Sequence, residues 1–225
     1  MDLLTASFIT LCLTLIPVTN PIGMAPIFLS FTTNLSKKER RGFALQVAML
    51  AFFFLIGTLI FGPILLKFFG ISLSFIKISG GLLLAITGWQ MLMTTKLENQ
   101  ERDGGKDINP PKTAFFPLAF PITVGAGSIA IVTTLASSYN NPEFTISAVV
   151  LNYAGGILAI AVDMALVAIC YGFSEEIFSK LGETGTEVVT KVTAFILMAI
   201  GFQVAWGGLQ NVIIETVKII KNLPL

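Results

Sequence analysis

Histidine is absent from this sequence of 225 residues, and charged residues are scarce. Without histidine there is no imidazole general base, no serine–histidine nucleophile and no histidine-ligated metal. Charged residues make up 12% of the chain, against about 25% in an ordinary soluble domain. The net charge of +1 gives no basic or acidic surface that would indicate nucleic acid as a partner. We therefore expect no enzymatic activity, no cofactor and no metal.

Cysteine is also rare, since only Cys12 and Cys170 occur and both lie in long apolar runs. We expect no disulfide between them. Apolar residues, in contrast, make up 54% of the chain. So few charges could not cover a water-exposed surface over that much apolar material. The sequence therefore predicts an integral membrane protein whose solvent is mostly the lipid bilayer.

Six stretches are long and apolar enough to cross a membrane, for which about 20 residues are needed. They are residues 3–31, 43–69, 71–93, 115–137, 145–171 and 188–212. The first and the fourth are interrupted by proline, glycine and polar residues. Between the third and the fourth lies a polar stretch, residues 95–112, which we interpret as a cytoplasmic linker.

The distribution of basic residues indicates the orientation of the chain. Lys37, Lys38, Arg40 and Arg41 follow the first apolar stretch, and further basic residues lie in the linker and after the fifth stretch. Loops rich in lysine and arginine stay in the cytoplasm. We therefore expect a multi-pass protein of the cell (inner) membrane with both termini on the non-cytoplasmic side.

The two halves of the chain resemble each other in sequence. Residues 17–22 (PVTNPI) align with residues 117–122 (PLAFPI), and residues 77–79 (KIS) align with residues 191–193 (KVT). Because each half has three apolar stretches, an odd number, the second half must cross the membrane in the opposite sense. We expect an all-α membrane protein of six transmembrane helices, arranged as two inverted three-helix repeats with the first helix of each broken. The repeats are residues 1–94 and 113–225.

The predicted breaks also resemble places where a new helix starts. Asn20 is a favoured N-cap residue and Pro21 suits the first helical position, which Pro121 does in the second half. Free backbone amides at helix starts bind anions, so two opposed starts near the midplane predict a site for a small carboxylate. A plain proline kink is the simpler explanation for either break alone. The candidate binding residues are Thr19, Asn20, Pro21, Gly23, Pro121, Thr123, Gly125, Ala126, Gly127 and Ser128.

The same segments resemble the hallmarks of a known family of multi-pass membrane proteins, the MarC family. Residues 20–28 (NPIGMAPIF) are similar to its Asn-Pro-x-Gly segment, and residues 116–129 (FPLAFPITVGAGSI) are similar to its second hallmark. The family usually has Gly-Pro-Gly where this chain has Gly125, Ala126 and Gly127. The family is also called a small neutral amino acid transporter family, and the resemblance thus implies glycine-like or alanine-like substrates.

Asp163 is the only acidic residue well inside a predicted span. Carboxylates within the membrane are costly and therefore often functional. Asp163 could carry a coupling proton or sodium ion, bind the amino group of a substrate, or pair with a lysine. The alternative is a carboxylate that faces a water-filled vestibule.

These observations favour a secondary transporter that moves small neutral amino acids. An exporter or channel for other small solutes is the second hypothesis. A membrane enzyme is a disfavoured third, because the acid and base groups that it would need are missing, and a chaperone or scaffold is the remaining alternative. No phosphate-binding loop of the Gly-Lys-Ser/Thr type occurs in the sequence, so we expect any driving force to come from an ion gradient.

Overall fold

The computed structural model describes residues 2–93, 114–139 and 144–221, and this part of the chain is helical without any strand. The predicted linker, residues 95–112, lies outside the described residues. The elements are α1 (Leu3–Thr19), α2 (Pro21–Phe31), α3 (Lys37–Phe69), α4 (Leu73–Met93), η1 (Ala114–Thr123), α7 (Ala126–Tyr139), α8 (Ile146–Gly172) and α9 (Ser174–Lys221).

Four helices are long and apolar enough to cross a membrane by themselves: α3, α4, α8 and the Thr184–Lys218 part of α9. Two bent pairs supply up to two further spans. The pair α1 and α2 is bent by 41°, and the pair η1 and α7 is bent by 68°. An all-helical fold with four to six candidate membrane spans is therefore confirmed for the described residues, and each bent pair is either a broken span or a re-entrant loop.

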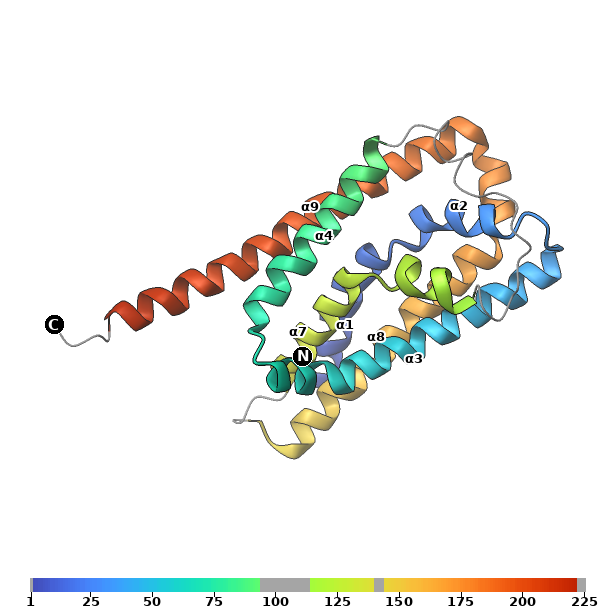
Figure 1. Cartoon of the computed structure of the whole chain (residues 1–225). Helices are drawn as coiled ribbons and strands as arrows, with labels where there is room; N and C mark the ends of the chain where they lie inside the picture. Colours follow the sequence, from blue (N-terminus) through green and yellow to red (C-terminus); the bar gives the residue numbers. More distant parts are fainter. Residues whose placement is uncertain (1, 94–113, 140–143, 222–225) are drawn as a thin grey trace.

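The helices form two sets that face each other across the breaks. α4 and α9 run side by side over most of the length of α4 (Figure 1). α8 packs against α1 and α3, while α7 contacts both α3 and α4. The α4–α9 contact is a backbone contact, because a Cβ atom added to Gly81 would lie 2.6 Å from the carbonyl oxygen of Gly201. Small residues of this kind let membrane helices approach closely.

Helix ends are set by local capping groups. α3 begins at a capping box in which the Ser36 side chain accepts from the Glu39 amide and the Glu39 carboxylate accepts from the Ser36 amide. It ends at Gly70, whose φ of 66° is in the left-handed region that glycine adopts readily. The side chain of Thr145 caps the start of α8.

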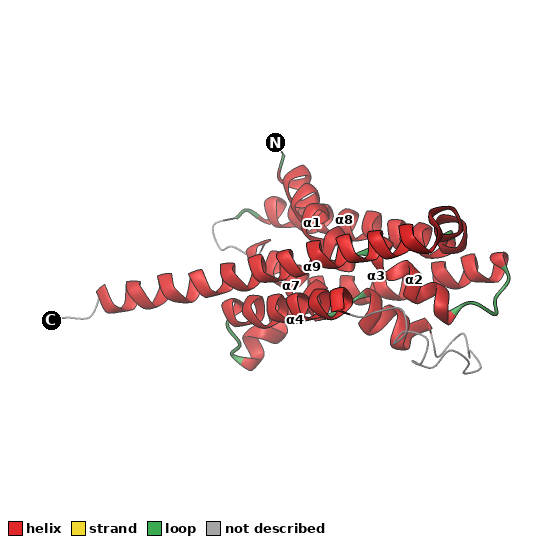
Figure 2. Cartoon of the chain, turned by 90° about the horizontal axis from the view of Figure 1, so that it is seen from above, coloured by secondary structure: helices red, strands yellow, loops and turns green. Residues whose placement is uncertain are grey.

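The sixth predicted span, residues 188–212, is too short. α9 begins at Ser174, bends at Gly182 with a φ of 68°, and continues to Lys221. Lys180, which follows the fifth predicted span and was expected in a loop, therefore lies in a helix. The chain changes direction at Gly182 instead. The end of α9 extends past the start of α4 (Figures 1 and 2) because the apolar pattern continues through Ile213, Ile214 and Val217.

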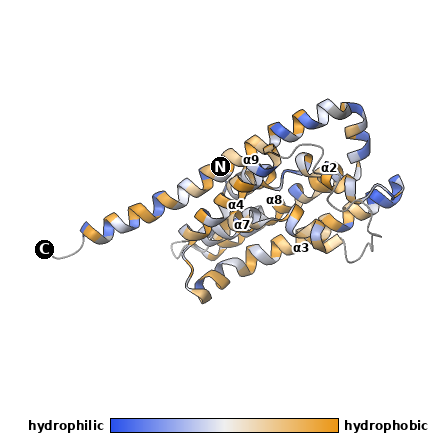
Figure 3. Ribbon diagram, turned by 45° about the horizontal axis from the view of Figure 1, so that its top comes forward, coloured by the Kyte–Doolittle hydropathy of each residue, from blue (hydrophilic) through white to orange (hydrophobic). Residues whose placement is uncertain are grey.

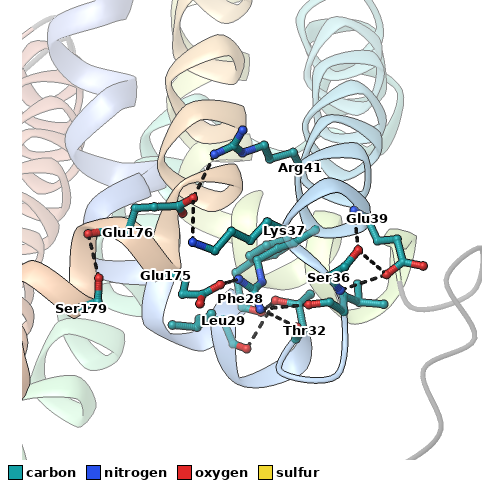
Figure 4. Close-up of polar contacts among 12 residues, drawn as sticks. Phe28, Leu29, Thr32, Ser36, Lys37, Glu39, Arg41, Glu175, Glu176 and Ser179 are labelled. Atoms are coloured by element: carbon teal, nitrogen blue, oxygen red, sulfur yellow. Dashed lines mark hydrogen bonds and ion pairs between the residues drawn. The ribbon is translucent and has the colours of Figure 1, made fainter.

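Hydrophilic residues gather where α3 and α9 begin (Figure 3). There, Arg40 pairs with Glu175, while Arg41 pairs with Glu176 at 2.9 Å and Lys37 lies 3.8 Å from the same carboxylate (Figure 4). A hydrogen bond from its own backbone amide, together with Arg41 and Lys37, holds the pKa of Glu176 below its ordinary value. This carboxylate therefore keeps its charge at neutral pH, and the ion pairs join α3 of the first half to α9 of the second.

The two arginines differ in their surroundings. The Arg40 side chain is 5% exposed, whereas the Arg41 side chain is 47% exposed. Arg40 also donates to the carbonyl oxygens of Thr32 and Leu35, both at 3.2 Å, at the end of α2. Arg41 stacks over the Phe173 ring at 4.2 Å.

We expect Arg40→Met to lower the free energy of unfolding by about 1–3 kcal/mol, because it leaves buried carbonyl groups without a donor. Arg41→Met serves as the matched control and is expected to cost about 1 kcal/mol or less, as exposed ion pairs do. Thermal unfolding of the purified protein in detergent measures both. An equal loss in the two variants would contradict the buried role of Arg40.

Candidate functional site

The first break is formed by a single residue, Asn20, which ends α1 and caps α2. Its φ of 46° and ψ of 57° lie in the left-handed region, which asparagine adopts more readily than most residues. Its side-chain oxygen accepts from the Gly23 amide at 3.1 Å, and Pro21 occupies the first turn of α2. The predicted N-cap at Asn20 is thus confirmed.

The start of α2 is closed by its own chain and by α9. Asn20 takes up the Gly23 amide, the Met24 amide donates to the Asn20 carbonyl at 2.9 Å, and proline has no amide hydrogen. A Cβ atom on Gly23 would lie 2.7 Å from the Thr193 hydroxyl of α9. Thr193 therefore packs against the break, a contact that could not be predicted from the sequence. In the first turn of α2, Ile22 is thus the one residue whose backbone amide has no partner among the described residues.

The second break has a different form, and the prediction that its half-helix starts at Pro121 is wrong. Phe120 is extended, with φ −135° and ψ 127°, as the residue before a proline tends to be. The Thr123 hydroxyl then donates to the Leu118 carbonyl at 2.8 Å and holds a wide turn in place. Regular helix resumes only at Ala126, where α7 begins.

The start of α7 keeps its amides free. The first bond of this helix runs from the Ile129 amide to the Gly125 carbonyl at 3.2 Å. The amides of Ala126, Gly127 and Ser128 precede it and have no hydrogen-bond partner among the described residues. Three such amides at a helix start carry partial positive charge. Of the two half-helix starts, α7 is therefore the one able to bind an anion with several donors.

Two side chains of one helix, α8, contact the two breaks. The Thr19 hydroxyl donates to Asp163 Oδ1 at 3.0 Å, and the Thr123 hydroxyl lies 3.1 Å from the Tyr171 hydroxyl. Asp163 and Tyr171 are both fully buried. They are eight residues apart, hence about 12 Å along the helix. Phe28 of α2 stacks on the Tyr171 ring at 4.6 Å, so α8 also contacts the second half of the broken helix.

Two buried polar groups beside the first break lack partners. Asp163 Oδ2 and the side-chain nitrogen of Asn20 make no hydrogen bond within the part of the chain that the structure describes. No basic side chain within the described ranges forms an ion pair with Asp163. A buried carboxylate without a cationic partner is costly. This arrangement suits a carboxyl group that holds a proton or takes up a cation. The described residues contain no group of three or more acidic or cysteine side chains that could hold a metal.

A cavity of about 410 Å³ lies between the two breaks. Every residue predicted for the second half-site lines it: Pro121, Thr123, Gly125, Ala126, Gly127 and Ser128. None of the four predicted from the first break does, namely Thr19, Asn20, Pro21 and Gly23. Their neighbours Val18, Met24 and Ile27 line the cavity instead. The structure thus brings the two breaks together, but it turns the polar residues of the first break toward α8 and α9.

The remaining wall comes from α4 and α9. Leu83, Leu84, Thr87 and Met91 of α4 line the cavity together with Leu197 of α9. Sequence reasoning missed these residues, because nothing in the helical pattern of α4 indicates which face meets the breaks. The only available signal was the sequence match between residues 77–79 and 191–193, which relates the third spans of the two halves but does not show how they pack.

Comparison with known proteins gives one consistent result. The profile of the MarC family, described as "MarC family integral membrane protein", matches residues 5–213. The chain is 30% identical over 202 residues to the UPF0056 membrane protein YvbG of Bacillus subtilis, covering 88% of this chain and 92% of that protein. It is 26% identical over 225 residues to the UPF0056 inner membrane protein MarC of Citrobacter koseri, covering 95% and 98%. No solved structure matches the chain.

We expect Thr123 and Tyr171 to be energetically coupled. Thr123→Val and Tyr171→Phe each remove one side of a buried hydroxyl contact, so the double variant should lose less stability than the two single losses together. The expected coupling is about 0.5–1.5 kcal/mol, measured by unfolding in detergent.

Thr58→Val is the control for this cycle, because the Thr58 hydroxyl bonds only the Phe54 carbonyl of its own helix. It should be additive with Tyr171→Phe. Full additivity of Thr123→Val with Tyr171→Phe would show that α8 does not hold the second break through this contact.

Proposed function

Because this chain belongs to the MarC family of integral membrane proteins, its activity has to be sought in the bilayer, and we propose that it is a secondary transporter of small neutral amino acids. Glycine and alanine are the proposed substrates. The observation that carries the proposal is the cavity that both helix breaks line, with three free amides on one side. Transporters bind their substrates between broken helices in this way.

The substrate carboxylate is assigned to the start of α7. The amides of Ala126, Gly127 and Ser128 are free, and all three residues line the cavity. The Thr123 hydroxyl lies at the same wall and is able to accept a hydrogen bond from the substrate amino group. The start of α2 contributes less than the sequence led us to expect, since its own residues take up most of its amides. A zwitterion suits a cavity of this kind because the described residues that line it carry no charge.

The arrangement of the halves is part of the proposal. Each half contains a bent pair followed by two long helices, and the repeated motifs fall at matching places. We take residues 1–94 and 113–225 as two inverted three-helix repeats. The basic residues Lys37, Arg40 and Arg41 lie together at one end of the bundle. This supports a cytoplasmic position for that end, and both termini of this inner-membrane protein then lie outside, an orientation that compartment-specific reporters at the two ends would test.

Asp163 is proposed as the coupling group. Its buried carboxylate needs a proton or a sodium ion to balance its charge, and its one hydrogen bond comes from Thr19, directly before the break. When Asp163 is neutralised, it becomes a weaker acceptor. The Thr19 hydroxyl then turns to the Leu15 or Ile16 carbonyl, each 3.2 Å away. Cation uptake is thus linked to the residue that precedes Asn20.

An exporter or channel that passes other small solutes is the second candidate. The largely apolar cavity wall favours it, because such a wall does not by itself require an amino acid. An enzyme is the least favoured role, since the cavity lining lacks a general base and a metal-binding group.

Reconstituted in proteoliposomes, the full chain is expected to take up radiolabelled glycine and alanine, and to accumulate label against unlabelled substrate held inside. Counterflow of this kind requires a carrier, whereas a channel lets the label equilibrate. Protein-free liposomes and radiolabelled arginine are the controls. If no small neutral amino acid crosses the membrane, the proposed function is wrong.

We expect Asp163→Asn to exchange substrate but to lose accumulation driven by a proton or sodium gradient, because the amide cannot change its charge. Cys12→Ala is the matched control, because Cys12 lies on α1, the helix that also carries Thr19, and this variant should keep gradient-driven uptake. Gradient-driven uptake by Asp163→Asn equal to that of the unchanged protein would remove Asp163 from the coupling step.

A further inference from the structure

The cavity between the breaks has two chemically different sides. One side is the turn from Thr123 to Ser128, with its hydroxyl groups and free amides. The other side is apolar apart from Thr87, and its apolar side chains come from four helices: Val18, Met24, Ile27, Leu84, Met91 and Leu197. A ligand that fills this cavity must therefore be polar at one end and apolar at the other.

Leu84 of α4 lies directly over the polar turn. A Cβ atom on Gly127 would lie 2.6 Å or less from the end of the Leu84 side chain. Leu84 therefore packs on the bare backbone of Gly127, and it is itself 7% exposed. Any group attached to a carboxylate that binds the Gly127 amide must pass beside Leu84. This side chain thus sets the room available next to the substrate Cα atom.

The volume of the cavity is larger than glycine or alanine requires. About 410 Å³ falls within the range of roughly 300–1,000 Å³ that is typical of pockets for drug-sized ligands. Glycine would leave the apolar wall unused. Each methylene group buried against such a wall raises affinity about fourfold, so a longer aliphatic side chain gains from the same cavity.

We propose that the apolar wall around Leu84 is a side-chain subsite, so that the protein takes neutral amino acids with aliphatic or thioether side chains in preference to glycine. Valine, leucine, isoleucine and methionine are the members of this class. This inference rests on the proposed function and specifies its substrate class. Leu84 is the residue that determines specificity, since it lies between the carboxylate site and the apolar wall.

Binding of glycine, alanine, leucine and arginine to the purified full chain in detergent tests the proposal, with isothermal calorimetry as the measurement. We expect leucine to bind at least about tenfold more tightly than glycine and arginine not to bind. Leu84→Phe should reduce leucine affinity about tenfold or more while it changes glycine affinity less than threefold. Leu84→Ala should allow phenylalanine to bind.

Leu82→Ala is the matched control, because Leu82 lies on the same helix, is 46% exposed and does not line the cavity. It should leave the order of affinities unchanged. If glycine and alanine bind but leucine does not, the subsite is wrong and the proposed function stands. If no amino acid binds, both are wrong. The comparison of ligands on the unchanged protein decides between these results even where a variant fails to fold.

Discussion

The position of both helix breaks depends on hydroxyl contacts to a single helix, α8. Thr19 donates to Asp163, and Thr123 bonds Tyr171, two turns further along. Backbone that leaves the helical path inside a membrane persists only where protein groups satisfy it, because lipid offers no hydrogen bonds. Since α8 is one continuous helix, its two contacts set the distance between the breaks. That distance in turn sets the size of the cavity between them.

The opposite wall of the cavity is held together by close backbone contacts between α4 and α9 instead of by hydroxyl contacts. α4 and α9 come from different halves of the sequence and meet backbone to backbone at Gly81 and Gly201. Lys191 of α9 also donates to the Leu92 carbonyl of α4. The pair is thus tied together internally. It meets the breaks through apolar side chains such as Leu84 and Leu197, through Thr193, and where Gly80 lies against Ala130 of α7. Transport as proposed requires the cavity to open to each side in turn. In the proposed transport cycle, the α4–α9 pair would move as a unit against α8, and the contacts within each unit would be kept.

Features that depend on residues adjacent in the sequence could be predicted. Features that depend on packing between distant parts of the chain could not. Asn20 and Pro21 form a cap by local chemistry, so the first break was found at the right residue. Pro121 obeys the same local rule, but the bond between Thr123 and Leu118 delays the helix to Ala126. Successive side chains of a helix point about 100° apart, so the sequence alone does not show which face of α1 meets the cavity. For this reason the sequence does not reveal that Val18 lines the cavity while Thr19 faces α8. Tyr171 and Leu84 lie in uniformly apolar segments, where nothing marks one position as special.

The two breaks are unequal, and in the proposed function this inequality determines how a substrate would lie between them. Asn20 closes the start of α2, which leaves that end with little to offer an anion. α7 has no such cap, and Ala126 occupies the place where the family pattern has a proline. Proline has no amide hydrogen, whereas Ala126 adds a donor beside those of Gly127 and Ser128. In the proposed mode of binding, the carboxylate is therefore drawn to one side of the cavity, and the substrate side chain is directed toward Leu84 and the α4–α9 wall. A site with two equal anion-binding ends would hold the substrate across the cavity and leave that wall without a role.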